Sequence, residues 1–254
     1  MRIRLVGSSL GKRYPHQFLM SLIVNDRLAF DAGAIGYVSP VSDQKKIKHV
    51  FLSHSHLDHI GSLPIFLDNV YESNPSCPTV YAAEYVRECL QSDFFNDRVW
   101  PNFLRLADEE TPFFRFENLA AGQTVIVDGL AVTPIAVDHV VPNLGFLIDD
   151  GDSTVALVYD TGPTCAVWQA MNQRDNLKAV FVEASFPDSM QWLAERAMHL
   201  TPKLLTAELT KLDKEVPVVV VHIKAAYDEE VIAELRDLKL PNLQIGEPDN
   251  TYVF

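Results

Sequence analysis

The hydrophobic positions of the chain fall into short runs that are rich in β-branched residues and separated by glycine, proline, aspartate and asparagine. Such runs predict β-strands, because β-branched side chains fit a pleated sheet and the intervening residues favour turns. The expected strands cover residues 3–6, 18–24, 48–53, 124–127, 130–137, 144–148, 154–159, 178–184 and 216–222.

Helical patterns alternate with strands mainly in the second half of the chain, around residues 164–172, 188–213 and 227–239. The clearest helix begins at Thr201, a favourable N-cap, and Pro202 follows at the first helical position. Leucines at helical spacing continue this helix. Strands packed face to face with helices outside them predict a layered α/β domain.

Residues 70–116 break this pattern, because they are aromatic-rich and irregular. We expect them to form an insertion or lid within a single domain that spans residues 1–254. The segment could equally be an interface, which keeps a homodimer open. Its aromatic rings could stack on a purine base, although such rings more often belong to a core. The rings in question are Phe94, Phe95, Trp100, Phe103, Phe113 and Phe114.

Composition and charge narrow the class of partner. An apolar fraction of 48% is typical of a globular domain. The formal net charge of −13 repels phosphate backbones at long range, so a nucleic-acid partner is not expected. A small anion stays compatible with this charge, because a bound metal ion can dominate the field of one pocket.

The cysteines and the apolar runs bear on the cellular compartment. Cys77, Cys89 and Cys165 form no CxxC pair, which favours a reducing compartment over a disulfide framework. The first residues lack the apolar run of a signal peptide, and no run approaches the length of a membrane helix. We therefore expect a cytoplasmic protein with no membrane partner.

The sharpest chemical feature is the sequence HSHLDH at residues 54–59, directly after a predicted strand. It places three of the chain's 8 histidines and one aspartate within six residues. A turn after the strand and a helix beginning at Asp58 would bring these side chains together. Imidazole nitrogens and carboxylate oxygens are ligands that zinc-like divalent ions prefer. The motif predicts a metal site, whereas the alternative is a solvated polar loop.

Further candidate ligands stand where later strands end. His139, Asp160 and His222 each follow an apolar run directly or within two residues. Open layered sheets place their sites at the carboxyl ends of strands. Any one of these residues could be a core histidine or a turn-forming aspartate, but the repeated placement favours a shared site.

The order HxHxDH, His, Asp, His resembles the metallo-β-lactamase fold of binuclear metal hydrolases, a four-layer αβ/βα sandwich. More narrowly, the chain resembles the class II 3′,5′-cyclic-nucleotide phosphodiesterases, in particular their bacterial members. The resemblance covers nearly the whole chain. It is carried by HSHLDHIGSLP (54–64), FNDRVWPNF (95–103), DHVVPNLGFLI (138–148), YDTGPT (159–164), KAVFVEASFP (178–187), HLTPKLL (199–205) and VVHIK (220–224).

The resemblance implies two divalent metal ions, with zinc expected first and manganese or iron as alternatives. The first ion would be held by His54, His56 and His139, the second by Asp58, His59 and His222, and Asp160 would bridge both. A hydroxide between the ions is the implied nucleophile. The implied reaction opens cyclic AMP or cyclic GMP to the 5′-monophosphate.

The resemblance also implies two catalytic residues, Asp58 and His199. His199 stands in an H-x-T context, where related phosphodiesterases place the histidine that protonates the departing alkoxide. An ordinary imidazole titrates near pH 6.5, so it can donate a proton at neutral pH. The alternative for His199 is an exposed histidine beside a helix.

Three weaker candidates surround this set. Asp31 could orient a metal-bound histidine or only shape a turn. Thr161 and Gly162 could offer a hydroxyl and a backbone N–H to a phosphate, or only form the turn after a strand.

Other activities of the same fold stay open at this point. A tRNA 3′-processing endonuclease would share the ligands, but neither a Lys/Arg cluster nor an RNA-gripping insertion is visible. A thioester, lactone or β-lactam hydrolase and an inactive metal-binding regulator are further alternatives.

Overall fold

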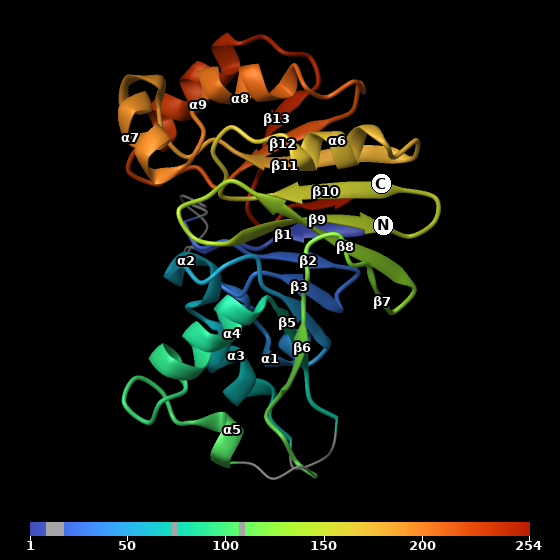
Figure 1. Ribbon diagram of the computed structural model, residues 1–254, viewed down its shortest axis with the longest axis vertical. Coiled ribbons are helices and arrows are strands. Elements are labelled where there is room, and N and C mark those ends of the chain that lie inside the picture. Colours follow the sequence, from blue (N-terminus) through green and yellow to red (C-terminus); the bar gives the residue numbers. More distant parts are fainter. Residues whose placement is uncertain (9–17, 73–75, 107–109) are drawn as a thin grey trace.

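A computed structural model describes residues 1–8, 18–72, 76–106 and 110–254, and within them two seven-stranded sheets pack face to face (Figure 1). The first sheet has the order β14 (Thr251–Val253), β1 (Arg2–Leu5), β2 (Leu22–Val24), β3 (Leu28–Phe30), β4 (His49–Phe51), β5 (Thr79–Ala82) and β6 (Arg115–Asn118). The second sheet has the order β13 (Leu243–Ile245), β12 (Val218–Val221), β11 (Leu177–Glu183), β10 (Thr154–Val158), β9 (Asn143–Asp149), β8 (Leu130–Val137) and β7 (Val125–Val127).

Helices cover the outer face of each sheet (Figure 1). Those beside the first sheet are α1 (Val41–Gln44), α2 (Leu57–Ile60), α3 (Leu63–Val70), α4 (Glu84–Cys89) and α5 (Phe103–Leu106), with short turns η1 (Ile35–Tyr37) and η2 (Leu90–Phe94). Those beside the second sheet are α6 (Ala166–Asn172), α7 (Gln191–Ala197), α8 (Pro202–Leu209) and α9 (Asp228–Asp237), with the turn η3 (Asp188–Met190). The predicted αβ/βα sandwich is therefore confirmed.

Strand β11 shows how the sequence produces these layers. Phe181 points into the core between the sheets, whereas Val180 and Val182 pack under the helices of the second sheet. Because both faces are covered, the strand is apolar throughout rather than alternating. Across the core, the rings of Phe30 and Phe146 join the two sheets with centroids 5.2 Å apart.

The sequence pattern did not predict several strands, because each is only three or four residues long. β3, β5, β6, β13 and β14 were not expected, and only the last part of residues 18–24 is a strand. β14 pairs antiparallel with β1, so the first and last strands of the described chain lie side by side.

We expected residues 70–116 to form an insertion, but part of this segment belongs to the first sheet. β5 lies inside it and pairs in parallel with β4 on one side and β6 on the other, so these residues belong to the sheet. The run TVYA is too short to stand out from its irregular neighbours. A lid role for the remainder, and the description of residues 1–254 as a single domain, stay predictions.

The remainder of that segment, residues 84–106 and 110–114, is called the aromatic lobe here. Phe95, Phe103 and Phe114 are buried in the core under the first sheet. The Phe103 and Phe113 rings stack with centroids 3.9 Å apart. The suggestion that the rings stack on a base is wrong for the three buried ones, because they are fully used in packing; Phe94, Trp100 and Phe113 pack against the same cluster.

No helix in the described part of the chain has the length and apolar character needed to span a bilayer. The cytoplasmic location expected from the sequence stays a prediction.

Candidate metal centre

Candidate ligands from both sheets meet at the carboxyl ends of their strands. His54 follows β4 of the first sheet, and His139, Asp160 and His222 follow β8, β10 and β12 of the second. These residues are far apart in sequence, and the sandwich brings them together along one edge. The expected placement at strand ends is what positions them.

The first set of ligand atoms surrounds one oxygen of Asp160. Asp160 Oδ2 lies 3.6 Å from His54 Nε2 and 3.7 Å from His139 Nε2. His139 Nε2 lies 3.2 Å from His56 Nδ1. All four ligand atoms fall within 4.8 Å of one another, close enough to converge on one ion.

The second set surrounds the other oxygen of Asp160. Asp160 Oδ1 lies 2.8 Å from His222 Nε2 and 3.3 Å from His59 Nε2. Asp58 Oδ2 lies 3.5 Å from His222 Nε2. Since each oxygen of Asp160 faces a different set, this carboxylate has the geometry of a shared ligand.

In His54, His59 and His139, one ring nitrogen contacts a protein group and the other faces the centre. In these three histidines, Nδ1 contacts the protein group. His54 Nδ1 lies 3.0 Å from Ser53 Oγ, and His59 Nδ1 lies 2.7 Å from Asp31 Oδ2. His139 Nδ1 lies 3.0 Å from Met198 O. Each Nε2 therefore points inward. His54 Nε2 is buried with no hydrogen-bond partner among the described residues. A buried orphan of this kind is costly, and a divalent cation would satisfy it. The donor set therefore fits a metal.

Asp31 supports both halves of the motif at residues 54–59. Its carboxylate contacts His59 Nδ1 and accepts hydrogen bonds from the Ser53 backbone N–H at 2.7 Å and hydroxyl at 2.8 Å. Carboxylates in this position fix the tautomer and orientation of a ligating imidazole. Of the two roles considered for Asp31, this geometry supports the orienting one.

The backbone around the centre is held in unusual conformations. Asp31, Met198 and His222 have positive φ angles of 59°, 54° and 56°. Such conformations cost about 1–3 kcal/mol each for residues other than glycine, and they gather at functional sites. The Ser185 hydroxyl donates to His222 O at 2.9 Å and helps to hold that turn.

Gly33 docks α2 and its ligands against the first sheet. A methyl group at Gly33 would lie 2.0 Å from the carbonyl oxygen of Asp58. The Met20 N–H donates to the same carbonyl at 2.8 Å, and the Ala32 N–H donates to His59 O at 2.6 Å. Only glycine permits this approach, so the sequence FDAGA is part of the centre's framework.

The charges of neighbouring groups in the centre shift one another's pKa values. Burial lowers the pKa of His59, but the Asp160 and Asp31 carboxylates outweigh it and raise that pKa well above its usual value. Burial raises the pKa of Asp160, but His222 and His59 outweigh it, and the pKa falls well below its usual value. Without metal, a protonated His59 therefore balances these carboxylates, and metal binding must displace its proton.

In the first ligand set the histidine pKa values are lowered, in contrast to that of His59. Burial lowers the pKa of His54 well below its usual value, and it lowers the pKa of His56 and His139 as well. These imidazoles are therefore neutral at pH 7, the form in which they bind metal. Burial raises the pKa of Asp58, but His59 and His222 outweigh it and lower that pKa, which favours the carboxylate.

His199 lies beside the centre and is not the exposed histidine that we considered as an alternative. It is 5% exposed, and its Nε2 lies 3.8 Å from Asp160 Oδ2. Its Nδ1 lies 2.8 Å from Glu183 Oε1. Burial lowers the pKa of His199, but the Glu183 carboxylate outweighs it and raises that pKa above its usual value.

Glu183, like Gly33, is a residue that sequence reasoning missed. It is fully buried at the end of β11 and accepts hydrogen bonds from the backbone N–H groups of Thr161, Ser185 and Leu200. An acidic residue closing the apolar run KAVFV was the available signal. Glu183 fixes the loop after β10 and the imidazole of His199 together.

Of the two roles considered for Thr161 and Gly162, their hydrogen bonds support the turn. The Thr161 N–H donates to Glu183, its hydroxyl donates to Gly162 O at 2.8 Å, and the Gly162 N–H donates to Asp138 O at 2.7 Å. The donors proposed for a phosphate are already used within the protein. These residues form the turn that presents Asp160.

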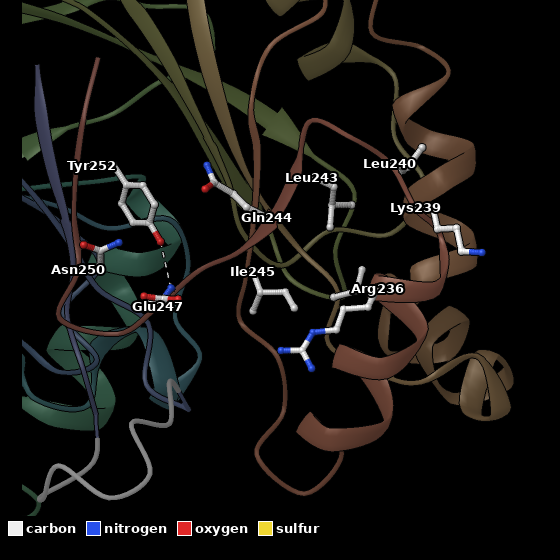
Figure 2. A pocket seen from close by; sticks show the side chains of 10 residues that line it. Arg236, Lys239, Leu240, Leu243, Gln244, Ile245, Glu247, Asn250 and Tyr252 are labelled. Atoms are coloured by element: carbon white, nitrogen blue, oxygen red, sulfur yellow. Dashed lines mark hydrogen bonds between the residues drawn. The ribbon is translucent and has the colours of Figure 1, made fainter.

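A cavity of about 480 Å³ lies elsewhere, between α9 and the edge strands β13 and β14 (Figure 2). Arg236 reaches toward it, while Lys239 points away. None of the candidate ligands lines this cavity.

Comparisons with known proteins agree with the fold. Residues 30–223 match the family model described as the beta-lactamase superfamily domain. A probable 3′,5′-cyclic-nucleotide phosphodiesterase of Yersinia pestis is 29% identical over 88% of this chain and 68% of its own length. A 3′,5′-cyclic-nucleotide phosphodiesterase of Aliivibrio fischeri is 26% identical over 70% of this chain and 60% of its own length. The matched part is thus about two thirds of these relatives or less.

The solved structure of unliganded yeast PDE1 superposes with a TM-score of 0.80, covering 98% of each chain at 17% identity. At that identity the likeness concerns the fold. The family resemblance read from the sequence is confirmed by these matches.

Proposed function

The chain belongs to the β-lactamase superfamily, and from this premise we propose that it is a metal-dependent phosphodiesterase that opens 3′,5′-cyclic nucleotides to 5′-monophosphates. The observation that carries the proposal is Asp160, whose two oxygens face two ligand sets while His199 lies 3.8 Å away. Two curated relatives named as 3′,5′-cyclic-nucleotide phosphodiesterases support the choice of substrate class.

Two divalent ions, with zinc as the first expectation, would occupy the centre. The first would be held by His54, His56 and His139, the second by Asp58, His59 and His222, and both by Asp160. When bound, such a pair supplies a nucleophilic water at neutral pH and neutralises charge on the phosphate. Asp31 and Ser53 orient the imidazoles, as outer partners of metal ligands commonly do.

His199 completes the reaction as the general acid. The incoming water oxygen bonds to phosphorus and releases one proton to solvent, while the P–O3′ bond breaks and the Nε2 proton of His199 moves to the departing O3′. A proton from solvent then restores His199. Glu183 accepts the Nδ1–H of His199, so the other ring nitrogen faces the centre. A ribose 3′-alkoxide is a poor leaving group, which gives a positioned acid its value.

Phosphorus NMR of metal-quantified protein with 3′,5′-cyclic AMP, with and without a chelator, tests the proposal. We expect 5′-AMP as the only product and no turnover after chelation. A 3′-monophosphate product, or turnover that resists chelation, would contradict it. Turnover of a precursor tRNA or a thioester but not of cyclic AMP would replace the proposed substrate class.

A further inference from the structure

Lys224 stands at the rim of the metal centre. Its ammonium nitrogen lies 3.9 Å from Asp58 Oδ2, and the side chain is 33% exposed. The same nitrogen lies 5.8 Å from the centre of the Phe186 ring. Among the described lysines and arginines, Lys224 is the one that forms an ion pair with a candidate metal ligand.

The backbone holds Lys224 at this position. Its N–H donates to Ser185 O at 3.2 Å, and its carbonyl accepts from the Tyr227 N–H at 2.9 Å. Phe186, which is 6% exposed, lies under the Lys224 ammonium and 5.6 Å from the His199 ring. A cation over an aromatic face is attracted to it, so this contact directs the ammonium toward the centre. Lys224 and His199, the proposed general acid, therefore both pack against Phe186.

Asp58 alone does not use this ammonium fully, because a separation of 3.9 Å is longer than a hydrogen bond. Asp58, its ion-pair partner, is also a candidate metal ligand, and a metal on that oxygen would repel the ammonium. Neighbouring cations become favourable when an anion lies between them, because each then pairs with it. An ammonium that is 33% exposed and lies 3.9 Å from Asp58 can reach an anionic group bound beside that carboxylate.

We propose that Lys224 binds a non-bridging oxygen of the substrate's phosphate and so selects anionic phosphorus centres. The inference rests on the proposed function for its substrate, but the anion contact itself can be tested without turnover. The ligand class is a phosphodiester monoanion or the monoester that it yields.

The test compares binding of inorganic phosphate and 5′-AMP to zinc-loaded protein by calorimetry. Lys224→Met removes the charge and keeps an unbranched side chain over the Phe186 ring. Its phosphate affinity should fall by about 10- to 100-fold, as expected for a hydrogen bond between charged groups. Lys224→Arg should restore most of that affinity. Lys178→Ala is the control. Lys178 is exposed at the amino end of β11, whereas Glu183 and the candidate centre lie at the carboxyl end of this strand.

Metal content and melting temperature separate this role from a structural one. We expect both to be unchanged in Lys224→Met. Equal phosphate affinity in wild type and Lys224→Met, or a loss of zinc that accounts for the weaker binding, would overturn the proposal. If phosphate binding depends on Lys224 but cyclic AMP is not hydrolysed, the anion contact stands and the proposed substrate fails.

Discussion

The metal centre and the aromatic lobe are both dense clusters of uncommon residues, but their side chains face in opposite ways. At the centre, imidazole and carboxylate atoms converge on Asp160, and His54 Nε2 has no hydrogen-bond partner among the described residues. In the lobe, the rings face one another, as in the stack of Phe113 on Phe103, whose centroids lie 3.9 Å apart. The convergence of ligand-type atoms on one point distinguishes this candidate site from a packed core.

The two regions also differ in how they are assembled. The centre joins strand ends from both sheets, whereas the lobe packs against the adjacent first sheet and its helices. Damage to the centre should therefore affect metal binding and turnover, and damage to the lobe should affect stability. The following variants test this division, from the largest expected effect on turnover to the smallest.

Asp160→Ala removes the carboxylate shared by the two ligand sets. We expect metal binding to collapse and turnover to fall to the level of the metal-free protein, measured by elemental analysis and product formation. Asp152→Ala, in an exposed turn, is the matched control. Full metal content in Asp160→Ala would mean that Asp160 is not a ligand.

His199→Ala removes the proposed acid and leaves the two ligand sets complete. The rate constant kcat should fall by about 10²- to 10⁴-fold, the usual contribution of a general acid. Metal content should be unchanged. Because His199, Glu183 and Asp160 could themselves hold an ion, loss of metal from this variant would instead identify His199 as a ligand.

Gly33→Ala places a methyl group against the Asp58 carbonyl, which displaces α2 and its ligands. Metal affinity should fall by about 10- to 100-fold, the range found when a supporting partner of a ligand is lost. Chelator competition measures this affinity. Gly151→Ala controls for glycine loss, because a methyl there meets nothing within 4 Å; it should lower stability through its φ of 94° and leave metal affinity unchanged.

Glu183→Gln removes the charge that raises the pKa of His199. The protonated form of His199 is the active acid, so turnover falls as pH rises through this pKa. Without the Glu183 charge, burial dominates and lowers the pKa, and the alkaline limb of the pH–kcat profile should move to lower pH. An unmoved limb would contradict the assignment of His199 as the acid.

The same pair links stability to pH. Because the pKa of His199 is raised in the folded state, the pair contributes stability that is fully present below about pH 6.5. That contribution is lost as the pH rises through the raised pKa.

Phe103→Ala tests the lobe and should leave turnover per folded molecule unchanged. The free energy of unfolding should fall by about 3–5 kcal/mol, because a buried aromatic ring is replaced by a cavity. Urea denaturation with parallel metal analysis measures both. A change in KM for cyclic AMP with unchanged stability would show that the lobe contacts substrate.

The sequence predicted the sandwich, and it selected seven candidate ligands that the structure brings together, because both depend on local features. Long β-branched runs identify buried strands, and a ligand that follows such a run is placed at the sheet edge. Glu183 and Gly33 were not found, because their roles depend on contacts with residues distant in sequence. The lobe could not be interpreted because composition does not reveal which way a ring faces.

We propose that the two ligand sets share Asp160 and together hold two ions. Native mass spectrometry of the zinc-loaded protein tests this most directly, combined with turnover measured at each zinc equivalent. We predict two ions per chain, with full turnover only after the second equivalent. A chain that saturates at one ion, or that turns over fully with one, would contradict the account.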